Sequence, residues 1–120
     1  MSLYELAERL KEMLEGTVYE KVVVDNVGAE CAVLAARRGE TLHLIALGVH
    51  DGWVYAKIAL GDAVPPRAWS CSNIFYTPYG LYAFATCLEE LVEKIAAKQP
   101  RLAAQAKVLE EALSKGLSLE

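Results

Sequence analysis

The sequence predicts an α+β fold: an N-terminal helix, a four-stranded antiparallel meander sheet, then two C-terminal helices. Three observations predict it. The chain of 120 residues opens with an amphipathic stretch, continues with four strand-length apolar runs joined by short turns, and closes with two stretches of helical spacing. A chain of this length is most simply one domain.

Residues 2–15 are expected to form the first helix. Their apolar side chains recur at intervals of three and four residues, which places them on one helix face. Ser2 and Glu5 form a Ser-x-x-Glu capping box, in which each side chain accepts a backbone N–H that the helix leaves unpaired. Gly16 is placed to end this helix in a left-handed conformation.

Four apolar runs are expected to form the sheet, and they read TVYEKVVVDN, AECAVLAARRG, TLHLIALGVH and WVYAKIALGD. Short turns join them. Gly39-Glu40 is a two-residue connection that suits a type II′ turn, and Asp51-Gly52 is one that suits type I′. Strands joined this tightly pair with their neighbours along the chain, so the four runs form an antiparallel meander.

The turn lengths also fix which residues face one another across the sheet. The predicted pairs are Leu34–Ile45, Ile45–Ile58 and Gly48–Tyr55. In this register one face is a core face. The other face mixes aliphatic, aromatic and basic side chains: Val33, Arg37, Leu42, Leu44, His50, Trp53, Tyr55 and Lys57. A sheet face in water alternates more cleanly, so we expect part of the chain, another subunit or a ligand to cover this face.

The connection after the fourth run contains Pro65-Pro66, which forbids regular structure there. Residues 72–76, SNIFY, read as a short edge strand. Thr77-Pro78 read as an N-cap followed by the first residue of a helix. From there an apolar stripe of helical spacing runs as far as Ile95.

Gln99-Pro100 breaks that helix. A last helix, at about 101–115, carries a seam two heptads long. The seam residues are Leu102, Ala106, Leu109 and Leu113. Two heptads are too short to stand alone, so the seam docks on the domain or on a second copy. We therefore divide the chain into an α+β domain, residues 1–98, and a C-terminal helix, residues 99–120, for packing or dimerisation.

Composition narrows the function classes. The net charge is −4, which speaks against simple electrostatic binding of nucleic acid. The apolar fraction, 54%, also suits a subunit that buries surface against a partner. No apolar run is long enough to span a bilayer, and the acidic amphipathic N-terminus does not read as a signal peptide. We expect a cytoplasmic protein without a membrane partner. The scarcity of Asn and Gln hints at a thermophile.

Catalytic and metal chemistry find little support in the sequence. Cys31, Cys71 and Cys87 are odd in number and widely spaced, which is neither a disulfide framework nor a zinc pattern. His43 and His50 point to opposite faces in the predicted register, so no metal site is expected. A dyad of Cys71 with either histidine is possible but lacks any supporting motif. We expect no enzyme, no metal and no cofactor.

The aromatic residues give the strongest remaining signal. Six of the ten lie between Trp69 and Phe84. Single-strand binders combine aromatic platforms with nearby cations. Trp53 and Tyr55 share a predicted sheet face with Lys57. Equally, these aromatics can pack that face as core, and we expect Tyr82 and Phe84 in particular to be packing residues.

The order of elements, together with the stretches WVYAK and PRAWSCSNIFY, resembles the ThermoDBP-related proteins of hyperthermophilic archaea. The resemblance covers nearly the whole chain, from SLYELAERL to LAAQAKVLEEAL. It implies a small single-stranded-nucleic-acid-binding protein, dimeric or of higher order. It also implies a cleft against the sheet, lined by aromatic and basic side chains. The sparse basic residues depart from this pattern.

We therefore predict sequence-nonspecific binding of single-stranded DNA, or RNA, by a homodimer. The residues expected to stack on bases are Trp53, Tyr55, Trp69, Phe75 and Tyr76. The residues expected to hold phosphates are Arg37, Lys57 and Arg67, with Lys21 as a further candidate. The alternative is a non-catalytic homodimeric interaction module that binds protein through the mixed sheet face and needs no cations near its aromatics. A third possibility is a small enzyme that uses Cys71.

Overall fold

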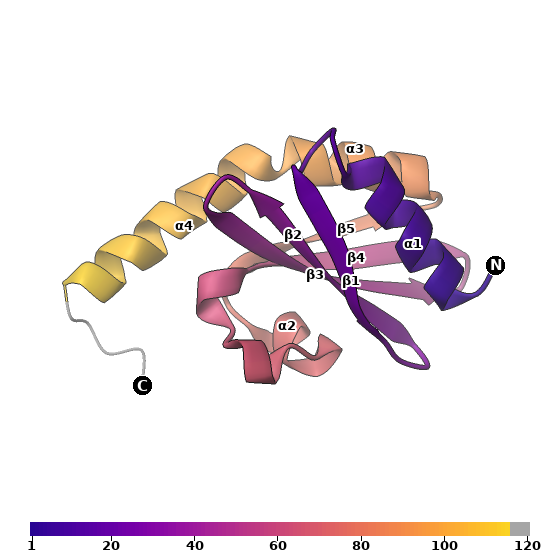
Figure 1. Cartoon of the computed structure of the whole chain (residues 1–120), viewed down its shortest axis with the longest axis horizontal. Coiled ribbons are helices and arrows are strands. Elements are labelled where there is room, and N and C mark those ends of the chain that lie inside the picture. Colours follow the sequence, from indigo (N-terminus) through magenta and orange to yellow (C-terminus); the bar gives the residue numbers. More distant parts are fainter. Residues whose placement is uncertain (116–120) are drawn as a thin grey trace.

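A computed structural model describes residues 1–115 as one five-stranded sheet with helices on both faces (Figure 1). All strands are antiparallel and lie in chain order, β1-β2-β3-β4-β5. The strands are β1 (Lys21–Val27), β2 (Cys31–Arg38), β3 (Thr41–His50), β4 (Trp53–Leu60) and β5 (Gly80–Ala85). The helices are α1 (Leu3–Leu14), α2 (Cys71–Tyr76), α3 (Leu88–Ala97) and α4 (Gln99–Ser114), with short 3₁₀ turns η1 (Gly61–Ala63) and η2 (Pro66–Ala68).

The N-terminal helix forms where the sequence predicts it. Ser2 is the N-cap, and its side-chain oxygen accepts a hydrogen bond from the backbone N–H of Glu5 at 3.1 Å. Gly16 follows the helix with a φ of +83°, the left-handed conformation expected of it. Leu10 and Leu14 are fully buried against the sheet, so the predicted apolar face is the packing face.

Both predicted hairpin registers are confirmed. Gly39-Glu40 and Asp51-Gly52 form two-residue connections. Gly39 has a φ of +62°, as a type II′ turn requires, while Asp51 and Gly52 have φ values of +48° and +81°, as type I′ requires. The predicted cross-strand pairs, Leu34–Ile45, Ile45–Ile58 and Gly48–Tyr55, all form.

The prediction of four strands is wrong, because residues 80–85 form a fifth strand rather than the start of a helix. The segment GLYAFA alternates: Ala83 and Ala85 are buried, whereas Tyr82 and Phe84 are exposed. That period of two belongs to a strand with one covered face. The helical stripe begins only at Leu88, after Cys87 as N-cap.

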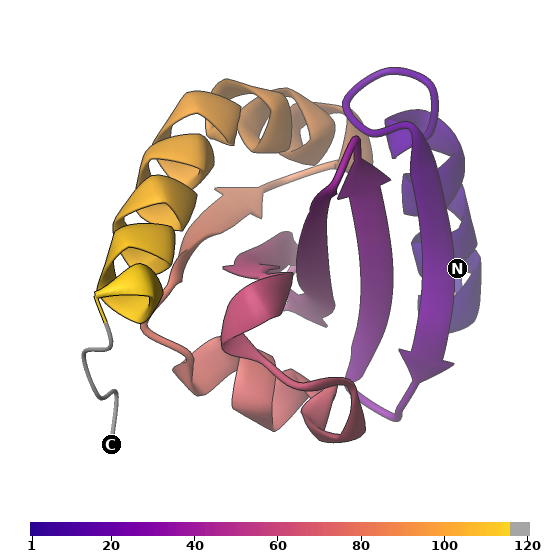
Figure 2. The same cartoon turned by 60° about the vertical axis from the view of Figure 1, so that its left-hand side comes forward.

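The two sheet faces carry two separate cores. The first face holds the larger one, where α1, α3 and α4 pack over the strands (Figures 1 and 2). Ile45, Ile58 and Leu91 are fully buried there. The second face is the mixed face of the sequence analysis. Its middle is covered by η1 and α2, with Leu44 and Ile74 fully buried in a smaller core. The chain itself therefore supplies part of the predicted cover.

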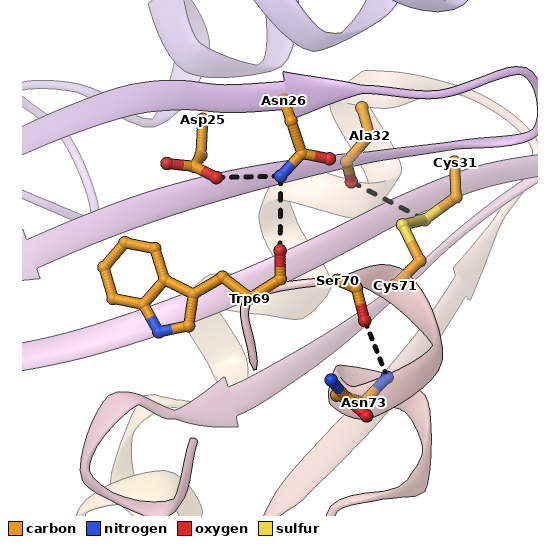
Figure 3. The surroundings of a disulfide bond; sticks show 8 residues. All are labelled: Asp25, Asn26, Cys31, Ala32, Trp69, Ser70, Cys71 and Asn73. Carbon is orange, nitrogen blue, oxygen red and sulfur yellow. Dashed lines mark hydrogen bonds between the residues drawn. A yellow bond between two sulfur atoms is a disulfide. The ribbon is translucent and has the colours of Figure 1, made fainter. Parts of the chain in front are cut away.

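The stretch SNIFY is helical, which corrects the predicted edge strand. Ser70 caps α2 by accepting the backbone N–H of Asn73 at 3.3 Å. The structure also joins Cys31, at the start of β2, to Cys71, the first residue of α2, in a disulfide (Figure 3). This pairing corrects the expectation that the cysteines form no disulfide. Cys87 is free and exposed.

The C-terminal helix α4 begins directly after α3, at the predicted break, but it starts at Gln99 rather than at about 101 and holds Pro100 in its first turn. Leu102 and Leu109 are buried in the first-face core, so this part of the seam docks on the domain. Leu113 and Val108 are exposed. Positions 116–120 of the predicted C-terminal segment lie outside the described residues. Among residues 1–115, no helix is long and apolar enough to cross a membrane.

Candidate aromatic binding surface

Six aromatic side chains gather at one end of the second face, and we call this group the aromatic surface. It consists of Trp53 and Tyr55 from β4, Phe75 and Tyr76 from α2, and Tyr82 and Phe84 from β5. The sheet brings them together because Tyr55 pairs with Phe84 across β4 and β5. Residues two apart on a strand share a face, which adds Tyr82 and Trp53. Helix α2 then places Phe75 against them.

Four of these rings form a closed cycle of neighbours. The centroid distances are 5.9 Å for Tyr55–Phe75, 6.1 Å for Phe75–Tyr82, 6.1 Å for Tyr82–Phe84 and 6.2 Å for Phe84–Tyr55. The planes of Phe75 and Tyr82 lie within 1° of parallel, and those of Tyr82 and Phe84 within 14°. Such pairs stabilise one another by about 0.5–1.5 kcal/mol beyond the area they bury, so the four rings support one another as a platform.

The aromatic surface stays open to solvent. Trp53 is 48% exposed, Phe84 52% and Tyr76 87%. A shallow hollow of about 470 Å³ lies over Trp53, Tyr55 and Phe84, with His50 at its edge. Contiguous exposed apolar patches on soluble proteins mark interaction sites more often than do single exposed residues. We therefore take the aromatic surface as the candidate functional site.

A glycine makes room for one ring of the platform. Tyr55 lies over its cross-strand partner Gly48, and a Cβ atom on Gly48 would collide with the Tyr55 ring. A strand glycine beneath an aromatic residue lets the ring lie close to the neighbouring backbone. The orientation of Tyr55 thus depends on Gly48.

Lys57 lies beneath this platform and is only 4% exposed. Its Nζ donates to the backbone carbonyls of Thr77, at 2.9 Å, and Phe75, at 3.4 Å, at the C-terminus of α2. It also sits 4.5 Å from the centroid of the Tyr82 ring, a cation–π contact. Burial lowers the pKa of Lys57 from its ordinary value. Lys57 therefore anchors α2, and the phosphate contact expected of it is not available in this arrangement.

Trp69 also differs from its predicted role. It is half-buried and packs on the smaller core, and its indole Nε1 donates to the carbonyl of Val64 at 3.1 Å. Its own carbonyl accepts from Asn26 of β1 at 3.3 Å (Figure 3). Trp69 thus covers the sheet. The residues that the prediction missed are Tyr82 and Phe84, whose alternation with buried alanines was the available signal.

Two of the other predicted cations, Lys21 and Arg37, lie away from the aromatic surface, and the third, Arg67, does not line the hollows over it. Lys21 pairs with Arg37 across β1 and β2, and Arg37 pairs with Leu42 across β2 and β3. Leu42 is six residues along β3 from Gly48, the partner of Tyr55, which is about 20 Å of strand. Both cations are exposed, as is Arg67 on η2. Of the predicted basic residues, Lys57 alone is therefore in contact with the aromatic rings among the described residues.

The immediate surroundings of the aromatic surface carry little positive charge. Two hollows overlie it, and among the described residues that line them there is no lysine or arginine, whereas Glu30 lines one. Lys94 donates to the Phe84 carbonyl beside the surface, but its Nζ is 3.2 Å from the Glu90 carboxylate in an ion pair. The site thus offers apolar area and ring faces rather than phosphate contacts.

Comparison with known proteins adds no assignment. No protein-family model matches the chain, and no match was found among curated proteins or solved structures. Within residues 1–115, no group of three or more His, Cys, Asp or Glu side chains is arranged to hold a metal ion.

Proposed function

We propose that the protein is a non-catalytic interaction module that binds a second copy of itself through the aromatic surface. The observation that carries the proposal is the openness of the aromatic surface, where Trp53, Phe84 and Tyr82 are each more than two-fifths exposed and no lysine or arginine is among the described residues that line the two hollows over it. Phe, Tyr and Trp are enriched at the buried centre of protein interfaces, where charged residues are depleted. The expected homodimer would bury this patch.

The charge distribution favours a second copy as the partner. In a two-fold dimer the same patch of both subunits forms the interface, so a charge at the centre of the patch lies opposite a like charge. A basic patch would repel its copy, whereas the rings of the aromatic surface can stack or meet edge to face with their symmetry mates. Burial of the patch is also favourable by about 25 cal/mol for each Å² of apolar surface removed from water.

The Phe84→Glu variant is expected to dissociate this dimer. A charge in the middle of the buried patch removes an aromatic anchor and adds an unpaired carboxylate. Loss of such an anchor raises the dissociation constant by about 30-fold or more, equivalent to about 2 kcal/mol. Sedimentation equilibrium on the wild type and the variant measures this change.

Val108→Glu is the matched control, because Val108 on α4 is 58% exposed and lies outside the aromatic surface. It should leave the dimer intact. A wild type that stays monomeric at high concentration would refute the proposal. So would dissociation by Val108→Glu with no effect of Phe84→Glu, which would place the dimer interface on the C-terminal helix.

A second candidate function is the predicted binding of single-stranded nucleic acid, for which the half-exposed, nearly parallel rings give specific support. Bases stack on such rings whatever their sequence, for about 1–3 kcal/mol per base. Phosphates further along the bound nucleic acid would then contact Arg37, Lys21 and Arg67. The resemblance to the ThermoDBP-related family implies this same function, so a test of nucleic-acid binding also tests what the resemblance implies.

Titration with oligo-dT tests this second candidate through tryptophan fluorescence. If bases stack on the aromatic surface, a single strand quenches Trp53 at low salt and its duplex counterpart does not. The quenching should persist in Trp69→Phe and vanish in Trp53→Phe. The double variant Lys21→Glu/Arg37→Glu should flatten the salt dependence, because fewer counterions are then released. Absence of quenching in the wild type excludes stacking and leaves the dimer proposal untouched.

A further inference from the structure

A further hollow, which shares no lining residue with those over the aromatic surface, lies between α4 and the β2–β3 hairpin. Its volume is about 560 Å³. The hairpin contributes Arg38, Thr41 and His43, and one face of α4 contributes Gln99, Ala103 and Lys107. This hollow combines a buried histidine with two basic side chains.

A chain of hydrogen bonds joins two residues that line this hollow, Gln99 and His43, through Tyr19. The Nε2 of Gln99 donates to the Ile95 carbonyl at 3.2 Å, and since a carbonyl only accepts, this contact fixes the orientation of the amide. The same Nε2 donates to the Tyr19 hydroxyl at 3.0 Å. The hydroxyl oxygen of Tyr19 lies 2.7 Å from Nδ1 of His43. The Tyr19 side chain is buried, and its hydroxyl has no other acceptor within hydrogen-bond distance among residues 1–115, so the hydroxyl donates its proton to Nδ1 of His43.

This chain fixes the tautomer of His43. With Nδ1 accepting from Tyr19, a neutral imidazole carries its proton on Nε2. Burial lowers the pKa of His43 to about 4 and raises the pKa of Tyr19 to about 12, so both groups keep these states at neutral pH. The Nε2–H donor has no hydrogen-bond partner among residues 1–115, and His43 lines the hollow.

The charges around this donor are mostly positive. Arg38 and Lys107 line the hollow, and neither forms an ion pair with the described part of the chain. Glu110 is the one acidic residue in the lining. Guanidinium and ammonium groups bind oxyanions through charge-assisted hydrogen bonds. The apolar side chain of Ala103 faces the same space.

We propose that this hollow binds a small organic oxyanion, a carboxylate or a phosphate monoester, between Arg38 and Lys107 with Nε2–H of His43 as the third donor. The two cations hold the charged group, and the neutral imidazole donates without needing protonation. The alanine-lined side of α4 accommodates the organic part. Carboxylates and phosphates share the acceptor geometry that this donor set requires.

Ring ¹⁵N NMR of His43 tests the proposal directly. The free protein is expected to show the Nε2–H tautomer. Titration with phenyl phosphate and with benzoate should shift the Nε2 signal in a saturable manner, and the tighter of the two probes identifies the preferred group. Arg38→Gln and Lys107→Gln should each weaken that binding by about tenfold or more, the effect of losing one charge-assisted contact.

Arg37→Gln is the matched control, because Arg37 is the neighbouring arginine on β2 but faces the opposite side of the sheet. It should leave the affinity unchanged, and an unchanged His43 tautomer in all three variants shows that the fold is intact. Three results would each overturn the proposal: an Nδ1–H tautomer, no saturable shift with either probe up to about 10 mM, or equal weakening by Arg37→Gln and Arg38→Gln.

Discussion

Removal of the Cys31–Cys71 disulfide is expected to lower the free energy of unfolding by about 4 kcal/mol. The bond joins residues 40 apart in the sequence, and a cross-link across a loop of this length restricts the unfolded chain by about that amount. The double variant Cys31→Ser/Cys71→Ser, compared with the wild type by urea unfolding, measures the loss. For a domain of this size it is a large share of the total stability.

Cys87→Ser is the control for this experiment, because Cys87 is exposed and forms no disulfide. It should unfold at the wild-type urea concentration. Reductant should destabilise the wild type and leave the double variant unchanged. If the double variant matches the wild type under oxidising conditions, the two cysteines are not bonded in solution.

Acid is expected to cost the protein about 3 kcal/mol through His43 alone. The pKa of His43 falls from its ordinary 6.5 to about 4 in the fold, and each unit of difference is worth about 1.36 kcal/mol. Between these two values the unfolded state binds a proton that the folded state does not, so stability rises with pH. The loss therefore begins as the pH drops below 6.5 and is complete below about 4.

Urea unfolding of the wild type and of His43→Gln across this pH range measures the effect. Carboxylates also titrate near its lower end, but they are common to both proteins, so the difference between the two curves isolates His43. The side-chain oxygen of glutamine can accept a hydrogen bond from the Tyr19 hydroxyl, and glutamine takes up no proton in this pH range. Parallel curves for the two proteins would mean that His43 titrates normally.

The parts of the fold that could be predicted are those fixed by local rules. Turn chemistry at Gly39 and Asp51-Gly52 set two hairpin registers, because the loop length leaves no freedom in pairing. The cap at Ser2 set the start of α1, because its side chain accepts a backbone N–H of the first helical turn. Each of these signals involves residues within a few positions of one another.

The fifth strand could not be separated from the helix that follows it by spacing alone. Leu81, Phe84 and Leu88 stand at helical intervals, so the stripe of α3 extends backward through β5. Pairing with β4 decides the outcome, since it satisfies the backbone groups of residues 80–85 and buries Ala83 and Ala85. Tertiary pairing of this kind overrides a local pattern.

Only part of the site could be predicted, because some of its features depend on local rules and others on long-range contacts. The sheet register placed Trp53, Tyr55 and Lys57 on one face correctly. Whether a side chain on that face is exposed depends on where the connection between β4 and β5 packs on the sheet. That packing is set by contacts between residues far apart in the sequence. Helix α2 covers Lys57 and leaves Trp53 exposed. The Cys31–Cys71 bond depends on the same docking, so the spacing of the cysteines carried no signal of it.

The strand order has a consequence for how the chain folds. Because β1 to β5 are neighbours in both sequence and space, each strand can join the sheet by closing one loop, and most of these loops are short. Low contact order of this kind is associated with fast folding. The contact between Gln99 and Tyr19 spans 80 residues. We therefore expect the meander to assemble first and the C-terminal helices to close over it last.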